Sequence, residues 1–337
     1  MNPLPLKSLM VAFRSNYALF RIGHGLRKGH PLNTHRRRFA IVLLGAVLAF
    51  GPLAAAETPS EEDQGIIVKA FGLEISSGAD LALQIRVNDV LVSQKTAGAT
   101  AAQSIPIQGE ILPGENRIEI SIGTAEIPPQ ASPTSSTARP DDTKLTVRLQ
   151  EDTTTEPKPG MYKTEVADLQ AKSWEPDRAG AALVLPQRLT MTFMASDTLE
   201  PPIWTRAAQR EVAAMQADLE RAYAGLIDML REGDVERLGQ TSRKAYAEAA
   251  RAYPLGGDAD ARERSDIAEI KSIATDPDVS FPAFEAPLKC VGYAENRLFE
   301  CFAEDGEPPV RAVFPGESPI FFRFLFSVLE NRLMVVR

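Results

Sequence analysis

The sequence predicts an α+β protein in which an antiparallel β-sandwich is followed by a helical segment packed on a second antiparallel sheet. Three observations carry this prediction. Residues 66–194 contain runs that alternate between apolar and polar with a period of two. Residues 205–274 place apolar side chains at spacings of three and four, and residues 287–337 return to the period of two. Helices that precede an antiparallel meander are typical of α+β domains, and 337 residues suffice for about two domains.

Residues 1–56 have the features of an export leader. A basic patch at 36–38 precedes an apolar run over 39–53, and small residues follow, which is the pattern that a signal peptidase recognises. We expect cleavage between Ala56 and Glu57 and therefore a periplasmic location. A membrane-anchored protein with an uncleaved leader is the alternative. No later apolar run reaches the roughly 20 residues that span a bilayer, so no membrane insertion is expected after cleavage.

Removal of the leader would make the chain strongly acidic. Residues 1–56 carry 8 of the 37 basic residues and none of the 45 acidic ones, so the remainder has a formal net charge of −16. A surface of this sign disfavours nucleic acid and anionic lipid, and it suits a basic protein partner. A merely solubilising surface is the alternative. Residues 57–65, which include Glu61, Glu62 and Asp63, are expected to form a solvated acidic linker.

The composition also restricts the chemistry. All three histidines, His24, His30 and His35, lie in the leader, which excludes Ser-His-Asp and Cys-His catalysis and histidine-based zinc sites in the mature chain. Arg262 interrupts the calcium-like segment that begins at Asp258, and no phosphate-binding glycine loop is present. We therefore predict no catalytic residue, no metal site and no cofactor. Paired carboxylates for glycoside hydrolysis are the enzymatic alternative, although no spacing singles out a pair.

The sandwich is predicted over residues 66–198. Asn88-Asp89 forms a two-residue hairpin turn, because both residues tolerate positive φ. Pro113-Gly114 leads into a strand with isoleucines on one face. The Pro-, Ser- and Thr-rich segments 127–143 and 153–160 are expected to be loops. The predicted strands cover 66–75, 82–87, 90–93, 104–107, 112–122, 144–150 and 183–194.

A hairpin turn at Asn88 followed by Leu112, Gly114 and Asn116 resembles the galactose-binding-like jelly-roll sandwiches. The resemblance covers about 66–195 and implies a domain that binds sugars or connects other domains, with the motif residues forming turns rather than contacting a ligand. Trp174 is a possible ligand contact, because an indole ring can serve as a platform for a sugar. Packing of a loop onto the sheet is the alternative role for this side chain.

The α+β domain is predicted over residues 203–337, with helices over about 205–274 and strands over about 287–337. Thr205 is the expected N-cap of a helix that runs to about Glu232. A second helix should follow from Asp234 to Tyr253, and a third should cover about 260–274. The predicted strands cover 288–293, 298–302, 310–314, 320–329 and 333–336. The helix junction at 230–238 and the closing hairpin resemble the cone fold of nuclear-transport-factor-like proteins, about 205–337, which implies a concave pocket.

Cys290 and Cys301 are symmetric about the predicted turn at Glu295-Asn296. A four-residue loop over 294–297 would make them a closely spaced cross-strand pair, which favours a bridge. We predict a disulfide, because an exported chain meets an oxidising compartment. Two reduced cysteines on the core face of the sheet are the alternative.

These observations favour an exported, periplasmic, non-catalytic binding protein whose partner is another protein. One concrete version is an immunity-like protein that neutralises a basic partner, for which the charge of −16 is the argument. The alternatives are a cell-wall or glycan-acting enzyme that uses carboxylates, and a glycan-binding module.

Overall fold

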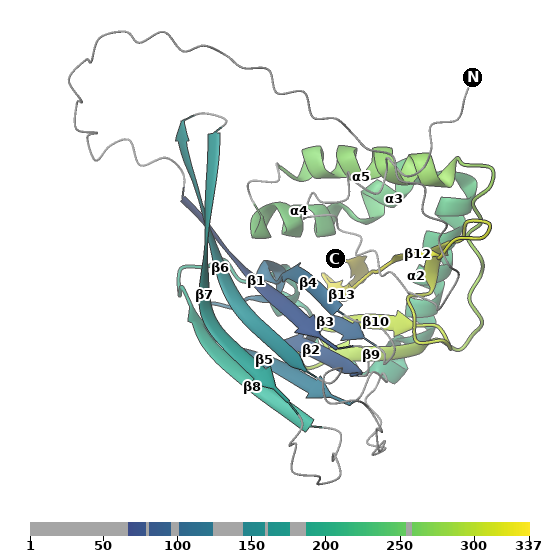
Figure 1. Cartoon of the computed structure of the whole chain (residues 1–337). Helices are drawn as coiled ribbons and strands as arrows, with labels where there is room; N and C mark the ends of the chain where they lie inside the picture. Colours follow the sequence, from purple (N-terminus) through teal and green to yellow (C-terminus); the bar gives the residue numbers. More distant parts are fainter. Residues whose placement is uncertain are drawn as a thin grey trace, which may run out of the picture.

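The computed structural model describes residues 67–78, 81–95, 101–123, 144–158, 161–175, 187–253 and 258–337. The predicted leader over 1–56, its cleavage site between Ala56 and Glu57, the acidic linker over 57–65 and the loop over 127–143 lie outside these residues. Within them, the predicted α+β fold class is confirmed: antiparallel strands form a sandwich, and helices pack with a second set of strands beside it (Figure 1). Among the described residues, no helix combines the length and the apolar character needed to cross a bilayer.

Two four-stranded sheets form the sandwich. One sheet has the order β4-β1-β6-β7 and the other has the order β3-β2-β5-β8, with every neighbouring pair antiparallel. Their inner faces enclose a core in which Ile118, Ile120 and Ile122 are fully buried, as the alternation predicts. The strands are β1 (Ile67–Ser77), β2 (Leu83–Val87), β3 (Val90–Lys95), β4 (Ala101–Pro106), β5 (Gly114–Ile122), β6 (Leu145–Lys158), β7 (Met161–Trp174) and β8 (Gln187–Ala195).

The turn residues of the sandwich behave as the sequence predicts. Asn88 and Asp89 have φ values of 49° and 68° and join β2 to β3. The Asn88 side-chain amide donates to the Glu110 carbonyl at 2.7 Å and to Asn116 Oδ1 at 2.6 Å. Asn116 Oδ1 also accepts the Leu112 N–H at 2.7 Å. The motif residues therefore hold the turns of the sandwich together.

The expected loop over 153–160 is wrong, because β6 continues to Lys158 and β7 begins at Met161. β7 lies at the edge of its sheet, and its side chains from Lys163 to Ser173 are all exposed. An edge strand with solvent on both faces needs no alternation of apolar and polar residues, so the period-two signal is absent. The adjoining ends of β6 and β7 extend beyond the other strands (Figure 1).

The long helix starts later than predicted. Thr205 belongs to a short 3-10 turn, η5 (Ile203–Arg206), and the helix α2 (Val212–Glu232) begins after Glu211. The backbone between these two elements forms hydrogen bonds with distant residues instead of within a helix. The Ala208 N–H donates to the Val328 carbonyl at 3.0 Å, and the Arg210 N–H donates to the Asn296 carbonyl at 3.1 Å. These hydrogen bonds attach residues 208–210 to the second sheet and its β9–β10 loop, so the helix begins only after them.

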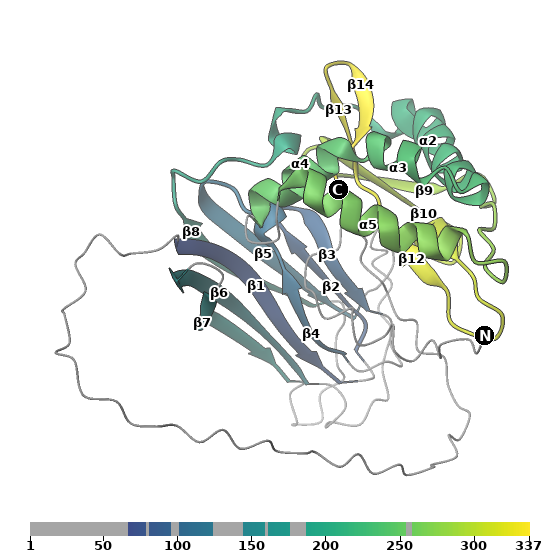
Figure 2. The same cartoon turned by 90° about the horizontal axis from the view of Figure 1, so that it is seen from above.

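The remaining helices follow the sequence with one difference. Gly233 ends α2 with a φ of 69°, and the Asp234 side chain accepts the Arg237 N–H at 3.2 Å as the next N-cap. The single helix predicted up to Tyr253 is divided at Ser242. The helices are α3 (Val235–Thr241), α4 (Arg243–Ala252) and α5 (Ala259–Ala274), and they lie together beside the sandwich (Figure 2).

The second sheet has the order β14-β13-β10-β9, and β11 and β12 form a separate pair. The single strand predicted over 320–329 is two strands in two sheets, because residues 323–325 between them belong to neither sheet; Arg323 there donates to Glu300. Apolar side chains of α2 and of these strands form a core of their own. The strands are β9 (Lys289–Tyr293), β10 (Leu298–Phe302), β11 (Val310–Ala312), β12 (Ile320–Phe322), β13 (Phe326–Leu329) and β14 (Arg332–Val335).

A third apolar cluster joins the sandwich to the α+β part. Val90 and Leu91 of β3 pack with Trp204, Tyr293 and Leu325, all of them buried. The Trp204 indole N–H donates to the Gly109 carbonyl at 3.3 Å across the same boundary. The two predicted domains therefore share a continuous buried interface, and their division stays a prediction.

Candidate binding groove

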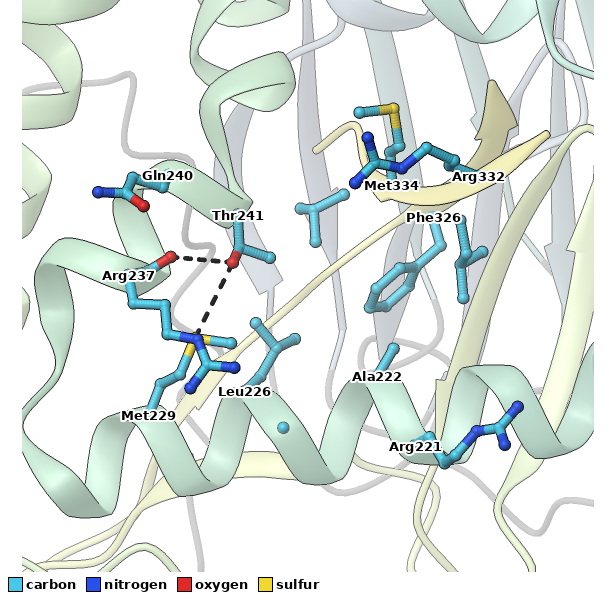
Figure 3. A pocket seen from close by; sticks show the side chains of 13 residues that line it. Arg221, Ala222, Leu226, Met229, Arg237, Gln240, Thr241, Phe326, Arg332 and Met334 are labelled. Carbon is cyan, nitrogen blue, oxygen red and sulfur yellow. Dashed lines mark hydrogen bonds between the residues drawn. The ribbon is translucent and has the colours of Figure 1, made fainter. Parts of the chain in front are cut away.

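A groove of about 540 Å³ lies between helices α2 and α3 and the closing β13–β14 hairpin (Figure 3). Its volume is within the range of about 300–1,000 Å³ that is usual for ligand sites. Three segments that are distant in sequence meet here: 221–229 on α2, 237–241 on α3 and 326–335 on the hairpin. The fold, rather than a local motif, creates this site.

The floor of the groove is apolar. Leu226 and Met229 rise from α2, and Phe326 and Val335 come from the hairpin, with exposed fractions of 1%, 8%, 2% and 2%. These side chains also belong to the hydrophobic core of the α+β part, so their positions are fixed by packing. A ligand group that reaches the floor would meet a preformed apolar surface.

The rim of the groove is cationic. Arg221, Arg237 and Arg332 line it from three different elements, and no Asp or Glu is among the lining residues that the structure describes. Arg221 makes an ion pair with Asp218 on its own helix. Arg237 and Arg332 are exposed, and neither forms an ion pair with any described carboxylate. The groove is therefore a positive site on a predominantly acidic chain.

Gly225 leaves room on the helical wall of the groove. It sits in the interior of α2, where glycine costs about 1 kcal/mol relative to alanine. A Cβ atom built on Gly225 would meet no heavy atom within 4 Å, so no packing contact requires a glycine here. The missing side chain leaves the helix backbone accessible to a ligand.

The groove runs along an edge of the second sheet. β14 is the terminal strand of the order β14-β13-β10-β9, and its four residues all line the groove. Consecutive strand residues point to opposite faces, so a site that touches all four must lie against the strand edge. The edge faces Gln240 and Thr241 of α3 across the groove (Figure 3).

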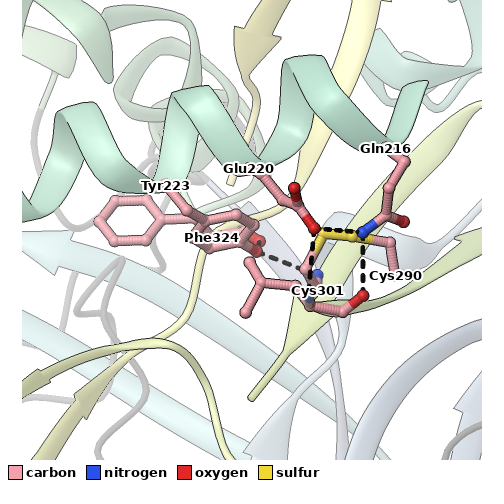
Figure 4. The surroundings of a disulfide bond; sticks show 7 residues. Gln216, Glu220, Tyr223, Cys290, Cys301 and Phe324 are labelled. Carbon is pink, nitrogen blue, oxygen red and sulfur yellow. Dashed lines mark hydrogen bonds between the residues drawn. A yellow bond between two sulfur atoms is a disulfide. The ribbon is translucent and has the colours of Figure 1, made fainter. Parts of the chain in front are cut away.

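The predicted disulfide is confirmed. Cys290 and Cys301 pair across β9 and β10 with a Cα–Cα distance of 4.0 Å, and the loop between the strands has the four residues 294–297. Glu220 and Gln216 of α2 bind the backbone of Leu288 next to this bridge, at 3.0 and 2.9 Å (Figure 4). The bridge therefore stands where the long helix is attached to the sheet, outside the groove.

Trp174 lies in the core of the sandwich. Its ring is 8% exposed, and its indole N–H donates to Gln187 Oε1 at 2.6 Å. A ligand would have to displace this packing to reach the ring. Asp258 is the N-cap of α5 and accepts the Ala261 N–H at 2.7 Å. In the described part of the chain, no group of three or more His, Cys, Asp or Glu side chains is placed to hold a metal ion.

Glu300 is the centre of a second polar cluster, which is buried at the boundary with the sandwich. It accepts hydrogen bonds from Arg323 at 2.6 Å and from the Tyr293 hydroxyl at 3.0 Å, and Arg323 also donates to the Leu91 carbonyl at 2.7 Å. Burial raises the pKa of Tyr293, and the Glu300 carboxylate adds to that rise. The guanidinium of Arg86 stacks on the Tyr293 ring at 5.5 Å. The cluster is internally paired, and it joins the two parts of the molecule.

No family model, curated protein or solved structure matches the chain.

Reasoning from the sequence did not find the groove. Arg221, Arg237 and Arg332 are far apart in the chain, and no local motif marks them. Two signals were present: a glycine at position 225 inside a regular helical pattern, and a closing hairpin with an arginine directly after its turn. Neither signal gives the relative placement of the three arginines.

Proposed function

We propose that the protein is an exported, non-catalytic binding protein that engages a protein partner through the groove beside β14. The observation that supports this proposal most directly is a buried apolar floor beside two exposed arginines, Arg237 and Arg332, that form no ion pair with a described carboxylate. Apolar anchor pockets bordered by arginine are typical of protein interfaces, where a few anchoring residues supply most of the affinity.

Export is proposed on two grounds. The leader pattern over 1–56 predicts transport and cleavage after Ala56. The Cys290–Cys301 disulfide is compatible with an oxidising compartment such as the periplasm.

A basic partner, such as the target of an immunity-like protein, would be attracted by the net charge of −16 that the chain carries after residue 56. The groove has the opposite sign, so such a partner would have to contact it through an apolar or acidic segment. The net charge would act at long range and increase the rate of association, whereas the contacts at the groove would stabilise the complex once it has formed.

Capture of a partner from periplasmic extract at low salt tests this proposal. The full chain is exported from a host bacterium, and its mass shows whether it begins at Glu57. Immobilised wild-type protein is compared with Gly225→Leu, which fills the groove and adds a better helix former, and with Arg188→Gln, a control substitution outside the groove on β8 of the sandwich.

We expect a partner that the wild type and Arg188→Gln retain and that Gly225→Leu releases. Unchanged or higher thermal stability of Gly225→Leu would show that the loss is not due to unfolding. Capture of no protein, or of the same proteins by all three variants, would contradict the proposal.

A further inference from the structure

The groove offers a partner charge rather than apolar area. The floor side chains Leu226, Met229 and Phe326 are at most 8% exposed, so a ligand can bury little further apolar surface on them. Helix α4 packs against β14, and Val335 of that strand is 2% exposed, so the strand edge is covered. The part of the groove that a partner can reach is its rim.

The rim presents two guanidinium groups without a carboxylate partner in the described part of the chain. Arg237 stands on α3 and Arg332 starts β14, and the two lie on opposite walls of the groove (Figure 3). Both are exposed, and neither forms an ion pair with a described carboxylate. Arg221, the third arginine of the rim, is already paired with Asp218.

The carboxylates that are close to Arg237 in sequence have other partners. Glu236 pairs with Lys271 at 3.0 Å, and Asp234 accepts the Arg237 backbone N–H at 3.2 Å as the cap of α3. A guanidinium group binds a carboxylate through paired, charge-assisted hydrogen bonds. The rim is therefore suited to carboxylates that come from outside the chain.

The backbone that carries the two arginines is held by core packing. Val235 and Leu238 of α3 and Val335 of β14 belong to the same hydrophobic core. The spacing of the two walls is therefore set before a partner arrives. A partner with carboxylates at a matching spacing would bind without the cost of ordering this backbone.

We infer that the partner contacts the groove through an acidic surface segment, whose carboxylates pair with Arg237 and Arg332 at the rim. The inference rests on the proposed binding function, and it decides between the apolar and the acidic contact that this function allows. The segment requires neither a strand conformation nor access to the floor of the groove.

The test uses the purified, exported protein and two rhodamine-labelled peptides, with fluorescence anisotropy as the measurement. The first probe is acetyl-Gly-Glu-Gly-Asp-Gly-Glu, and the second has glutamine, asparagine and glutamine at its three acidic positions. The net charge of −16 repels the acidic peptide, so tighter binding of this peptide would report the local charge of the groove. We expect the acidic peptide to bind at least about tenfold more tightly than the amide peptide.

Two double variants locate the site. Arg237→Gln combined with Arg332→Gln should abolish the preference for the acidic peptide. Arg188→Gln combined with Arg264→Gln should retain it, because these two exposed arginines lie outside the groove and form no ion pair with a described carboxylate. Both double variants lose the same charge, so the comparison separates pairing at the rim from long-range electrostatics.

Four results would overturn the inference: no binding of the acidic peptide at millimolar concentration, equal or tighter binding of the amide peptide, an unchanged preference in the rim variant, or an equal loss of preference in the control variant. The peptide test needs no natural partner. Failure of the capture experiment with success here would leave the rim site standing without its proposed partner. Capture that Gly225→Leu abolishes, together with no peptide preference, would overturn the acidic contact alone.

Discussion

At the scale of single residues, two buried tyrosines make opposite contributions. The Tyr223 hydroxyl donates to the Phe324 carbonyl at 3.0 Å and accepts the Cys301 N–H at 3.1 Å (Figure 4). The Tyr246 hydroxyl is buried, and it has no hydrogen-bond partner among the described residues. A buried hydroxyl without a partner costs stability, whereas a paired one contributes to it.

We therefore expect Tyr246→Phe to raise the free energy of unfolding by about 1 kcal/mol and Tyr223→Phe to lower it by about 1–3 kcal/mol. Urea titrations of the two variants, which carry the same chemical change, provide the measurement. A lower free energy of unfolding for Tyr246→Phe would show that the Tyr246 hydroxyl has a hydrogen-bond partner in the folded protein.

The stabilising effect of Tyr246→Phe should depend on pH. Burial raises the pKa of Tyr246, and Asp266 and Glu263 add to the rise, so the folded state favours the neutral phenol. A raised pKa contributes stability that is fully present below the unfolded value of about 10 and is lost as the pH increases beyond it. The advantage of Tyr246→Phe should therefore grow above pH 10, which unfolding at pH 8 and at pH 10.5 would reveal.

At the scale of elements, the β9–β10 hairpin depends on its disulfide. The bridge closes a short loop and lies where Glu220 and Gln216 attach α2 to the backbone of Leu288. Replacing both cysteines by alanine should lower the free energy of unfolding by about 2–4 kcal/mol, the usual effect of removing such a bridge. Denaturant titrations should give the same free energy of unfolding for the variant and for the wild type in reductant. A wild type whose free energy of unfolding does not change with reductant would contradict the prediction.

The hairpins also show which elements were predictable. The strand with Ile118, Ile120 and Ile122 and the Asn88-Asp89 turn were predicted correctly, because one buried face and positive φ leave direct signals in the sequence. β7 was missed because both of its faces meet solvent. The start of α2 was misplaced because the backbone between Ala207 and Arg210 is bonded to residues about 90 to 120 positions away.

At the scale of the whole molecule, buried charge couples the sandwich to the α+β part. Arg323 joins Glu300 to the Leu91 carbonyl of β3, and Arg337 pairs with Glu110, which is 1% exposed. A buried ion pair adds little net stability, but removal of one partner leaves an uncompensated charge. The two parts of the molecule are expected to unfold together.

The variant Arg323→Met should lower the free energy of unfolding by about 3–5 kcal/mol, because it leaves Glu300 buried without its counterion. Circular dichroism follows the helices, and fluorescence follows the two tryptophans, Trp174 in the sandwich core and Trp204 at the boundary. The two transitions should coincide in the wild type, and separate transitions there would disprove the coupling.

The amino-acid sequence alone is sufficient to predict the fold class, most strands with one buried face, the tight turns and the pairing of Cys290 with Cys301. Each of these depends on residues that are close in the chain, so periodicity and turn chemistry are sufficient to predict them. The placement of Arg221, Arg237 and Arg332 around one groove follows only from the three-dimensional arrangement of α2, α3 and the last hairpin. The physical reason is that a binding site depends on the relative placement of distant elements, which is set by the packing of α2, α3 and the last hairpin around a shared core.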